Sequence, residues 1–117
     1  MKNQSQFSPY NQVKAVFQFI AAHYHQSISL CDVAKAVGYS PAYLTDLVRR
    51  ETGQTVNQWI TEHRLNKASC LLLTTNQTVS EIAETVGYQN INYFFRQFRH
   101  RYDITPQIWR KSQRDFG

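Results

Sequence analysis

The side chains with the most distinctive chemistry are amides and guanidinium groups, and they are suited to hydrogen bonding rather than to making or breaking bonds. Asn92 carries the donor and acceptor that match an adenine edge, and Arg96 carries the fork that matches the O6 and N7 atoms of guanine. Ser40 and Asn90 stand where helices are expected to begin, a position that suits contacts with phosphate groups. These residue types indicate recognition of a double-stranded nucleic acid.

No set of residues in the sequence indicates catalysis or a bound metal. His23 and His25 are two residues apart and would point to different faces of a helix, and the other two histidines have no nearby ligand partners. Cys31 and Cys70 lie within helical patterns, where buried free thiols are expected. The sequence contains no glycine-rich phosphate loop and no nucleophile motif. We therefore expect a protein that is not an enzyme and that needs no cofactor.

The positions of the candidate residues are set by a segment that occurs twice. The first copy reads LCDVAKAVGYSPAYLTDL from Leu30, and the second reads VSEIAETVGYQNINYFFRQF from Val79. The offset between matched residues is 49 up to the Gly-Tyr pair and 50 after it, because the second copy has one extra residue. The matched pairs are Ala34 and Ala83, Gly38 and Gly87, Tyr39 and Tyr88, Tyr43 and Tyr93, Leu44 and Phe94, Thr55 and Thr105, and Trp59 and Trp109.

Each copy has the pattern of two helices joined by a tight turn. In the first copy, apolar residues at helical spacing precede Gly38, and glycine adopts the left-handed backbone of a helix end at little cost. Ser40 then begins a second helix with Pro41 at its first position. Ala34 at the helix crossing, the turn glycine and Leu44 as an apolar lock are typical of a helix-turn-helix. One copy alone would fit a plain helical hairpin equally well, whereas two matched copies favour a tandem reader of nucleic acid.

The pattern predicts an all-α chain in which two helix-turn-helix subdomains are joined by a long linker helix. At ~1.5 Å per residue that linker would span ~27 Å, close to the ~34 Å between successive major-groove faces of B-DNA. It would therefore set the spacing of the two subdomains. The expected segments are a flexible N-terminus (1–9), a first subdomain (10–54), the linker helix (55–73), a second subdomain (74–111) and a flexible tail (112–117).

Charge and hydropathy restrict the partners and the compartment. The net charge is +5, and residues 89–117 hold six Lys or Arg against two Asp or Glu, while residues 1–88 hold seven against six. The excess positive charge thus lies on the second subdomain and the tail, as expected for an end that faces phosphates. No apolar run approaches the ~20 residues of a membrane span, and the N-terminus does not read as a signal peptide. The expected location is the cytoplasm.

With the repeat, the spacer and the closing ITPQIWR in view, the chain resembles the DNA-binding domain of the AraC/XylS transcription regulators from about Val13 to Lys111. The most specific parts are IAETVGYQNINYFFRQFRHRYDITPQIWR in the second copy and RRETG at the end of the first. The resemblance implies seven helices, with the two recognition helices in adjacent major-groove segments. It also implies double-stranded DNA and RNA polymerase as partners, and an effector or dimerisation domain outside this sequence. The chain would then be a small regulator or an excised domain.

Burial of Leu44, Leu47 and Val48, and of Phe94 and Phe98, leaves a set of outward positions on each recognition helix, which match the positions that the family uses. We name Ala42, Thr45, Asp46 and Arg49 the first recognition face, and Asn92, Phe95, Arg96 and Arg99 the second recognition face.

Two residues of the recognition faces have more than one possible role. Phe95 would press on a thymine methyl group or pack on a partner domain. Asp46 stands where the family would lead one to expect a base-reading or basic residue, and we expect it to pair with Arg49 or Arg50 rather than with cytosine. Arg99, His100 and Arg101 are expected to contact phosphates or to remain solvated.

Asp103 replaces the common glycine, a change that the fold should accept because aspartate tolerates the left-handed cap better than most residues. Two other functions remain open from the sequence: a helical module that binds proteins, and the DNA-targeting part of a larger DNA-modifying enzyme.

Overall fold

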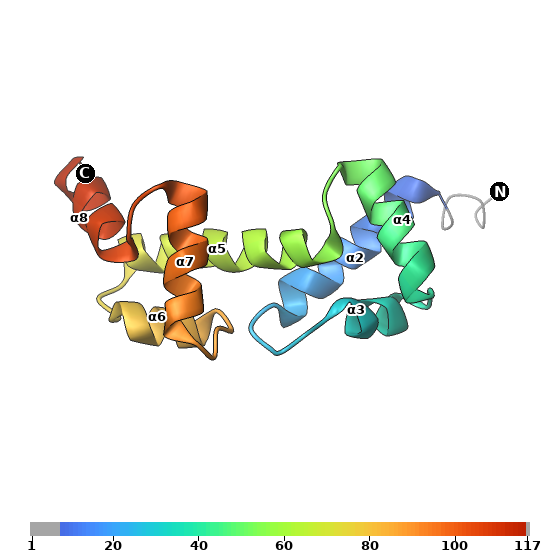
Figure 1. The fold of residues 1–117 in the computed structure, drawn as a ribbon, viewed down its shortest axis with the longest axis horizontal. Coiled ribbons are helices and arrows are strands. Elements are labelled where there is room, and N and C mark those ends of the chain that lie inside the picture. Colours follow the sequence, from blue (N-terminus) through green and yellow to red (C-terminus); the bar gives the residue numbers. More distant parts are fainter. Residues whose placement is uncertain (1–7, 117) are drawn as a thin grey trace. The chain divides into compact units, whose positions relative to one another are not determined.

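A computed structural model describes residues 8–116, and this part of the chain contains seven helices and no strand. The all-α class and the helix number predicted from the sequence are confirmed. Figure 1 shows the helices in chain order. They are α2 (Pro9–His23), α3 (Leu30–Val37), α4 (Pro41–Thr52), α5 (Val56–Thr74), α6 (Val79–Thr85), α7 (Ile91–Tyr102) and α8 (Pro106–Phe116).

Short polar residues begin most of these helices. Ser40 Oγ accepts a hydrogen bond from the Tyr43 N–H group at 3.1 Å, with Pro41 at the first position of α4. Thr78 and Glu81 exchange two hydrogen bonds at the start of α6 and form a capping box. The bond from the Thr78 N–H group lowers the pKa of the Glu81 carboxyl group. These local bonds satisfy N–H groups that have no partner within the helix.

Left-handed residues end the helices that lead into turns. Gly38 ends α3 at φ 83° and Gly53 ends α4 at φ 79°. Asp103 takes the same role after α7 at φ 71°, and it is the only non-glycine residue with positive φ among those that the structure describes. The aspartate predicted to replace a cap glycine therefore does so, with the backbone strain that a side chain brings to this region.

The chain divides into two compact units, Met1–Ile60 and Thr61–Gly117. In the first unit, α2 packs against α3 and α4, and the beginning of α5 closes the core. Trp59 of α5 donates a hydrogen bond to Thr52 Oγ1 at 2.8 Å and meets the Phe17 ring edge-on at 4.9 Å. The buried apolar residues of this unit are Val13, Val16, Ile20, Val33, Ala34, Leu44, Leu47, Val48, Val56 and Ile60.

The second unit uses the rest of α5 together with α6, α7 and α8. The rings of Phe98, Tyr102 and Trp109 contact one another and hold α8 against α7. Tyr102 also donates from its hydroxyl group to the Leu65 carbonyl of α5 at 3.4 Å. The buried apolar residues of this unit are Leu65, Ala68, Leu72, Val79, Ile82, Ala83, Val86, Tyr88, Phe94 and Phe98.

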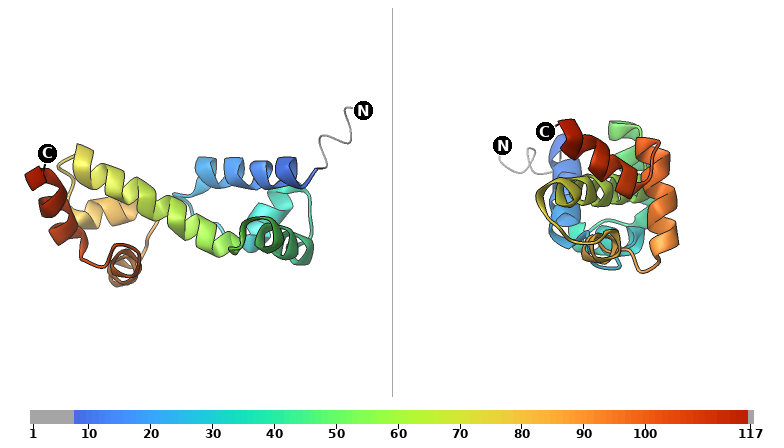
Figure 2. Two further views of the ribbon diagram at one scale, coloured as in Figure 1. Left: turned by 90° about the horizontal axis from the view of Figure 1, so that it is seen from above. Right: turned by 90° about the vertical axis from the view of Figure 1, so that its left-hand side faces the viewer.

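Two arginines of α8 cap the carboxyl end of α5. Arg110 Nε donates to the Leu72 carbonyl at 3.0 Å, and Arg114 donates to the carbonyls of Leu72 and Thr75. These bonds satisfy carbonyl groups that the helix itself leaves free. Figures 1 and 2 show α8 beside this end of α5. The helix runs to Phe116, so the predicted tail (112–117) is helical over its described residues and α8 is longer than expected.

Three further sequence-based expectations can be compared with the structure. The division between Ile60 and Thr61 falls inside α5, so the predicted linker segment (55–73) is shared by the cores of both units. The predicted burial of Cys31 and Cys70 is wrong, because both thiols are free and exposed on the outer sides of their helices. Within residues 8–116 we find no helix with the length and apolar character needed to cross a membrane.

Candidate nucleic-acid interface

The first recognition face lies on the outer side of α4. Leu44, Leu47 and Val48 are fully buried, as predicted, and turn the opposite side of the helix outwards. All four residues of the first recognition face are exposed: Ala42, Thr45, Asp46 and Arg49. Ser40 is also exposed, and its Oγ caps α4 as an acceptor, which leaves its hydroxyl hydrogen available to donate.

Asp46 forms an ion pair with Arg50, one turn further along α4. The predicted pairing within the helix is confirmed, with Arg50 rather than Arg49 as the partner. Both side chains are more than half exposed, at 70% and 51%, so water and salt screen the pair and it adds little stability. Arg50 also lies 3.5 Å from Glu51. Among the described residues Arg49 makes no ion pair, and its guanidinium group is available on the exposed face.

The second recognition face lies on the outer side of α7, opposite the buried Phe94 and Phe98. Asn92, Arg96 and Arg99 are exposed as predicted. Phe95 is less exposed than its predicted outward position implied. It is only partly exposed, and its ring lies 6.2 Å from that of Phe94. It therefore offers less surface to a ligand than a fully exposed phenylalanine would.

Asn90 holds the amino end of α7. Its Oδ1 accepts hydrogen bonds from the N–H groups of Asn92 at 2.9 Å and Tyr93 at 3.2 Å. The side-chain amide of Asn90 keeps its N–H donors, which can still point to an anion at the helix start. The residue therefore fixes the direction in which Asn92 leaves the helix.

The basic residues near the end of α7 have different roles. Arg96, Arg99, His100 and Asp103 line an open hollow of about 480 Å³. Arg101, which the sequence predicted to contact a phosphate or to remain solvated, is exposed and forms an ion pair. It binds Glu62 of α5 through two nitrogens at 3.0 to 3.2 Å, and these hydrogen bonds raise its pKa. This ion pair joins two helices whose residues lie 39 positions apart, which no local pattern reveals.

Two tyrosines on the recognition helices are exposed, and the sequence analysis did not assign either of them to the interface. Tyr43 of α4 is 41% exposed and Tyr93 of α7 is 47% exposed. The Arg96 guanidinium carbon lies 5.5 Å from the centre of the Tyr93 ring, within the range of a cation–π contact. The sequence did contain a signal that relates these two tyrosines. They occupy matched positions in the repeat, and each directly precedes a buried residue of its recognition helix.

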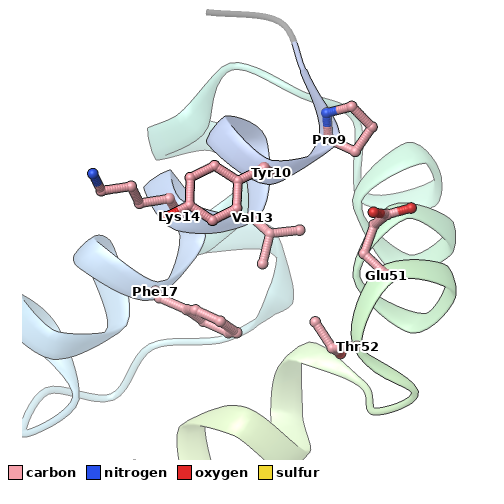
Figure 3. A pocket seen from close by; sticks show the side chains of 7 residues that line it. All are labelled: Pro9, Tyr10, Val13, Lys14, Phe17, Glu51 and Thr52. Carbon is pink, nitrogen blue, oxygen red and sulfur yellow. The ribbon is translucent and has the colours of Figure 1, made fainter. Parts of the chain in front are cut away.

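A different hollow, of about 280 Å³, lies on the first unit between α2 and the end of α4 (Figure 3). Tyr10, Val13 and Phe17 form its apolar side on α2, and Glu51 and Thr52 lie across from them on α4. None of the residues that line it belongs to a recognition face. The hollow is thus separate from the candidate interface.

Over residues 8–116, no group of three His, Cys, Asp or Glu side chains is placed to hold a metal ion.

The comparisons with known proteins agree with this geometry. Residues 33–112 match the family described as helix-turn-helix domain. The chain is 32% identical over 102 residues to the regulatory protein PocR of Salmonella typhimurium, covering 87% of this chain and 34% of PocR. It is 35% identical over 98 residues to the regulatory protein SoxS of the same organism, covering 84% of this chain and 92% of SoxS. The chain thus spans about a third of the first relative and nearly all of the second.

A solved structure gives the same result. It is a transcriptional regulator of the AraC-type DNA-binding domain-containing proteins from Chromobacterium violaceum. It superposes with a TM-score of 0.81 at 26% identity, over 86% of this chain and 89% of that chain. Shared fold and sequence therefore run through nearly the whole of the described part of the chain.

Proposed function

Because the chain belongs to the AraC family of helix-turn-helix DNA-binding domains, we propose that α4 and α7 are its two recognition helices and that each enters the major groove of one DNA duplex. The domain binds double-stranded DNA in a sequence-specific manner, and its family regulates transcription rather than catalysing a reaction. The remaining question is which side chains read the bases.

The observation that carries the proposal is the pair of matched outward faces on α4 and α7. Each follows a capped helix start, and each presents polar or basic groups opposite a fully buried apolar side. On the second recognition face, Asn92 pairs with an adenine edge, Arg96 with a guanine, and the exposed part of Phe95 with a thymine methyl group. Arg99 contacts a phosphate beyond the bases.

The first recognition face, on α4, carries less positive charge than the second. Thr45 and Arg49 are its polar residues that contact bases, and Ala42 allows the helix to approach the groove closely. Asp46 is engaged with Arg50 and limits the attraction of this helix for phosphates. Ser40 and Asn90 donate to phosphates at the starts of the two helices. The second unit therefore supplies more of the electrostatic attraction, in line with the positive balance of residues 89–117.

The proposal includes partners beyond DNA. We propose RNA polymerase as the protein partner, because regulators of transcription act on that enzyme, and we propose the cytoplasm as the location. About two thirds of PocR lies outside the matched region. An effector or dimerisation domain on the same polypeptide is therefore part of the proposal.

The length and symmetry of the DNA site test the proposal. A monomer should protect about two helical turns, ~20 base pairs, because two recognition helices with contacts one turn apart require that length. The selected site should be asymmetric, since the two recognition faces differ at three of their four matched positions and have only Arg49 and Arg99 in common. Selection from random duplexes followed by footprinting measures both properties. A single short protected segment, or a palindrome bound only by dimers, would contradict the proposal.

Asp46 gives a second test on the first recognition face. If the ion pair with Arg50 is its main role, Asp46→Ala should strengthen binding to all duplexes, because it removes a negative charge near the phosphates and releases Arg50. The gain should be a few-fold, in proportion to a screened surface charge worth about 0.2–1 kcal/mol. Affinities for the selected site and for its single-base variants, at one salt concentration, provide the measurement. Loss of discrimination at one base pair would instead make Asp46 a reader of cytosine.

A further inference from the structure

The two copies of the repeat place a tyrosine at the same point of each recognition helix, but the two hydroxyl groups are bonded differently. Tyr43 donates its hydroxyl hydrogen to Gln12 Oε1 at 3.0 Å. Gln12 belongs to α2 and is only 7% exposed, so this hydrogen points into the first unit. What Tyr43 presents to the outside is a ring edge and oxygen lone pairs, which a phosphate oxygen cannot use.

Tyr93 has the opposite arrangement. Its hydroxyl oxygen accepts a hydrogen bond from Gln97 Nε2 at 2.7 Å. The other end of the same amide, Gln97 Oε1, accepts from the hydroxyl group of Tyr88. The amide is therefore held at both ends, and the hydroxyl hydrogen of Tyr93 is left to donate outwards.

Tyr88 anchors this chain of bonds inside the second unit. It is 6% exposed, its ring contacts the buried Phe94, and the guanidinium group of Arg64 lies over its ring at 5.7 Å. Burial raises the pKa of the Tyr88 hydroxyl group well above its ordinary value. The hydroxyl group therefore keeps its hydrogen and remains a donor to Gln97 over the whole physiological pH range.

The ring of Tyr93 has a second contact, with Arg96 of the second recognition face at 5.5 Å. A cation over an aromatic ring is held in place by the ring quadrupole. Tyr93 is also nearly half exposed, one turn before Arg96 on the same helix. Its hydroxyl group and its ring thus have separate partners, Gln97 for the hydroxyl group and Arg96 for the ring.

We propose that Tyr93, unlike its counterpart Tyr43, donates a hydrogen bond to a DNA phosphate and supports the guanidinium group of Arg96, and that Gln97 is a positioning residue that sets the direction of the Tyr93 hydroxyl group. The inference rests on the proposed function, in which Arg96 reads a base. According to this inference, an uncharged side chain contacts a phosphate group, and only the second copy of the repeat binds DNA through its tyrosine.

Tyr93→Phe tests the hydroxyl group alone, because the ring stays in place. A hydrogen bond to a charged acceptor corresponds to about tenfold in affinity, so the variant should bind the selected site and random duplex about tenfold more weakly. The salt slope should not change, because a neutral hydroxyl group releases no counterion. Tyr93→Leu removes the ring as well, and should lose a further two- to fivefold of preference at the base pair that Arg96 reads, roughly the size of a cation–π contact.

Tyr43→Phe is the matched control in the first copy. It should leave DNA affinity unchanged, because the hydrogen of Tyr43 is bound to Gln12 in the protein. Gln97→Leu should weaken binding in the unmodified chain and have no effect in the Tyr93→Phe background, since it acts only through that hydroxyl group. Thermal melting checks that each variant folds. If Gln97→Leu does not fold, the two tyrosine variants still decide the question.

The outcomes separate this inference from the proposed function. If Tyr93→Phe binds as tightly as the unmodified chain, or if Tyr43→Phe loses as much affinity as Tyr93→Phe, the inference is wrong. Arg96→Ala can still reduce base preference in that case, and the proposed function then stands without it. If Arg96→Ala leaves base preference unchanged, the proposed function of the second recognition face fails instead, whatever Tyr93 does.

Discussion

Insertion of one alanine between Ile60 and Thr61 should abolish most of the sequence-specific binding while each unit remains folded. One added residue turns everything that follows in α5 by ~100° about the helix axis and moves it ~1.5 Å along it. The two recognition helices then cannot meet their groove segments together. The loss should be on the order of 100-fold at the selected site, equivalent to one or two base contacts of about 1–3 kcal/mol each.

The place of the insertion decides whether the experiment is interpretable. Ile60 is the last core residue of the first unit, and Thr61 begins the second. An insertion near Asn66, in the middle of α5, would instead fall between the buried residues Leu65 and Ala68 and would damage the core of the second unit.

Thr61→Ala is the matched control for this insertion, because it changes the same position without turning the helix. Affinity is measured on the selected and random duplexes, with circular dichroism to check folding. A folded insertion variant with unchanged specific affinity would show that the phase of α5 has no role.

Arg96→Ala and Arg99→Ala should have different effects, although both arginines are exposed on α7. Arg96 lies nearer the helix start, where recognition helices contact base edges. Its loss should cost ~1–3 kcal/mol at the selected site and flatten the preference at one base pair. Arg99 lies nearly one turn further on, closer to the end of α7, although both arginines line the open hollow. Its loss should weaken all sequences alike and lower the salt slope by about one unit.

Lysine at each position provides a control for charge. Arg99→Lys should retain most of the binding because a point charge suffices for a phosphate, whereas Arg96→Lys should recover only part of the preference, because lysine lacks the planar fork. Binding is titrated on cognate, single-base-altered and random duplexes at several salt concentrations. Equal losses on cognate and random DNA for both alanine variants would mean that the second recognition face only anchors the domain.

The helices and their ends follow from local features of the sequence. Apolar spacing identified the buried residues of both recognition helices, such as Leu44 and Phe94, and Ser40 followed by Pro41 marked the start of α4. Asp103 adopts the left-handed backbone that its match to a cap glycine predicted. These features depend on contacts within about one turn of helix, so residue type and spacing are sufficient to predict them.

The sequence by itself thus determined the all-α class, the repeat and the side of each recognition helix that faces outwards. Only the tertiary structure decided how individual groups on those sides are engaged. Arg101 is held by Glu62, 39 positions away, and Tyr43 is held by Gln12, 31 positions away. Partners so far apart in the chain meet only when the helices pack, because a periodic pattern shows which side of a helix is buried but not which residue lies opposite. For the same reason two tyrosines at equivalent places in a repeat can direct their hydroxyl hydrogens differently, one into the protein and one outwards.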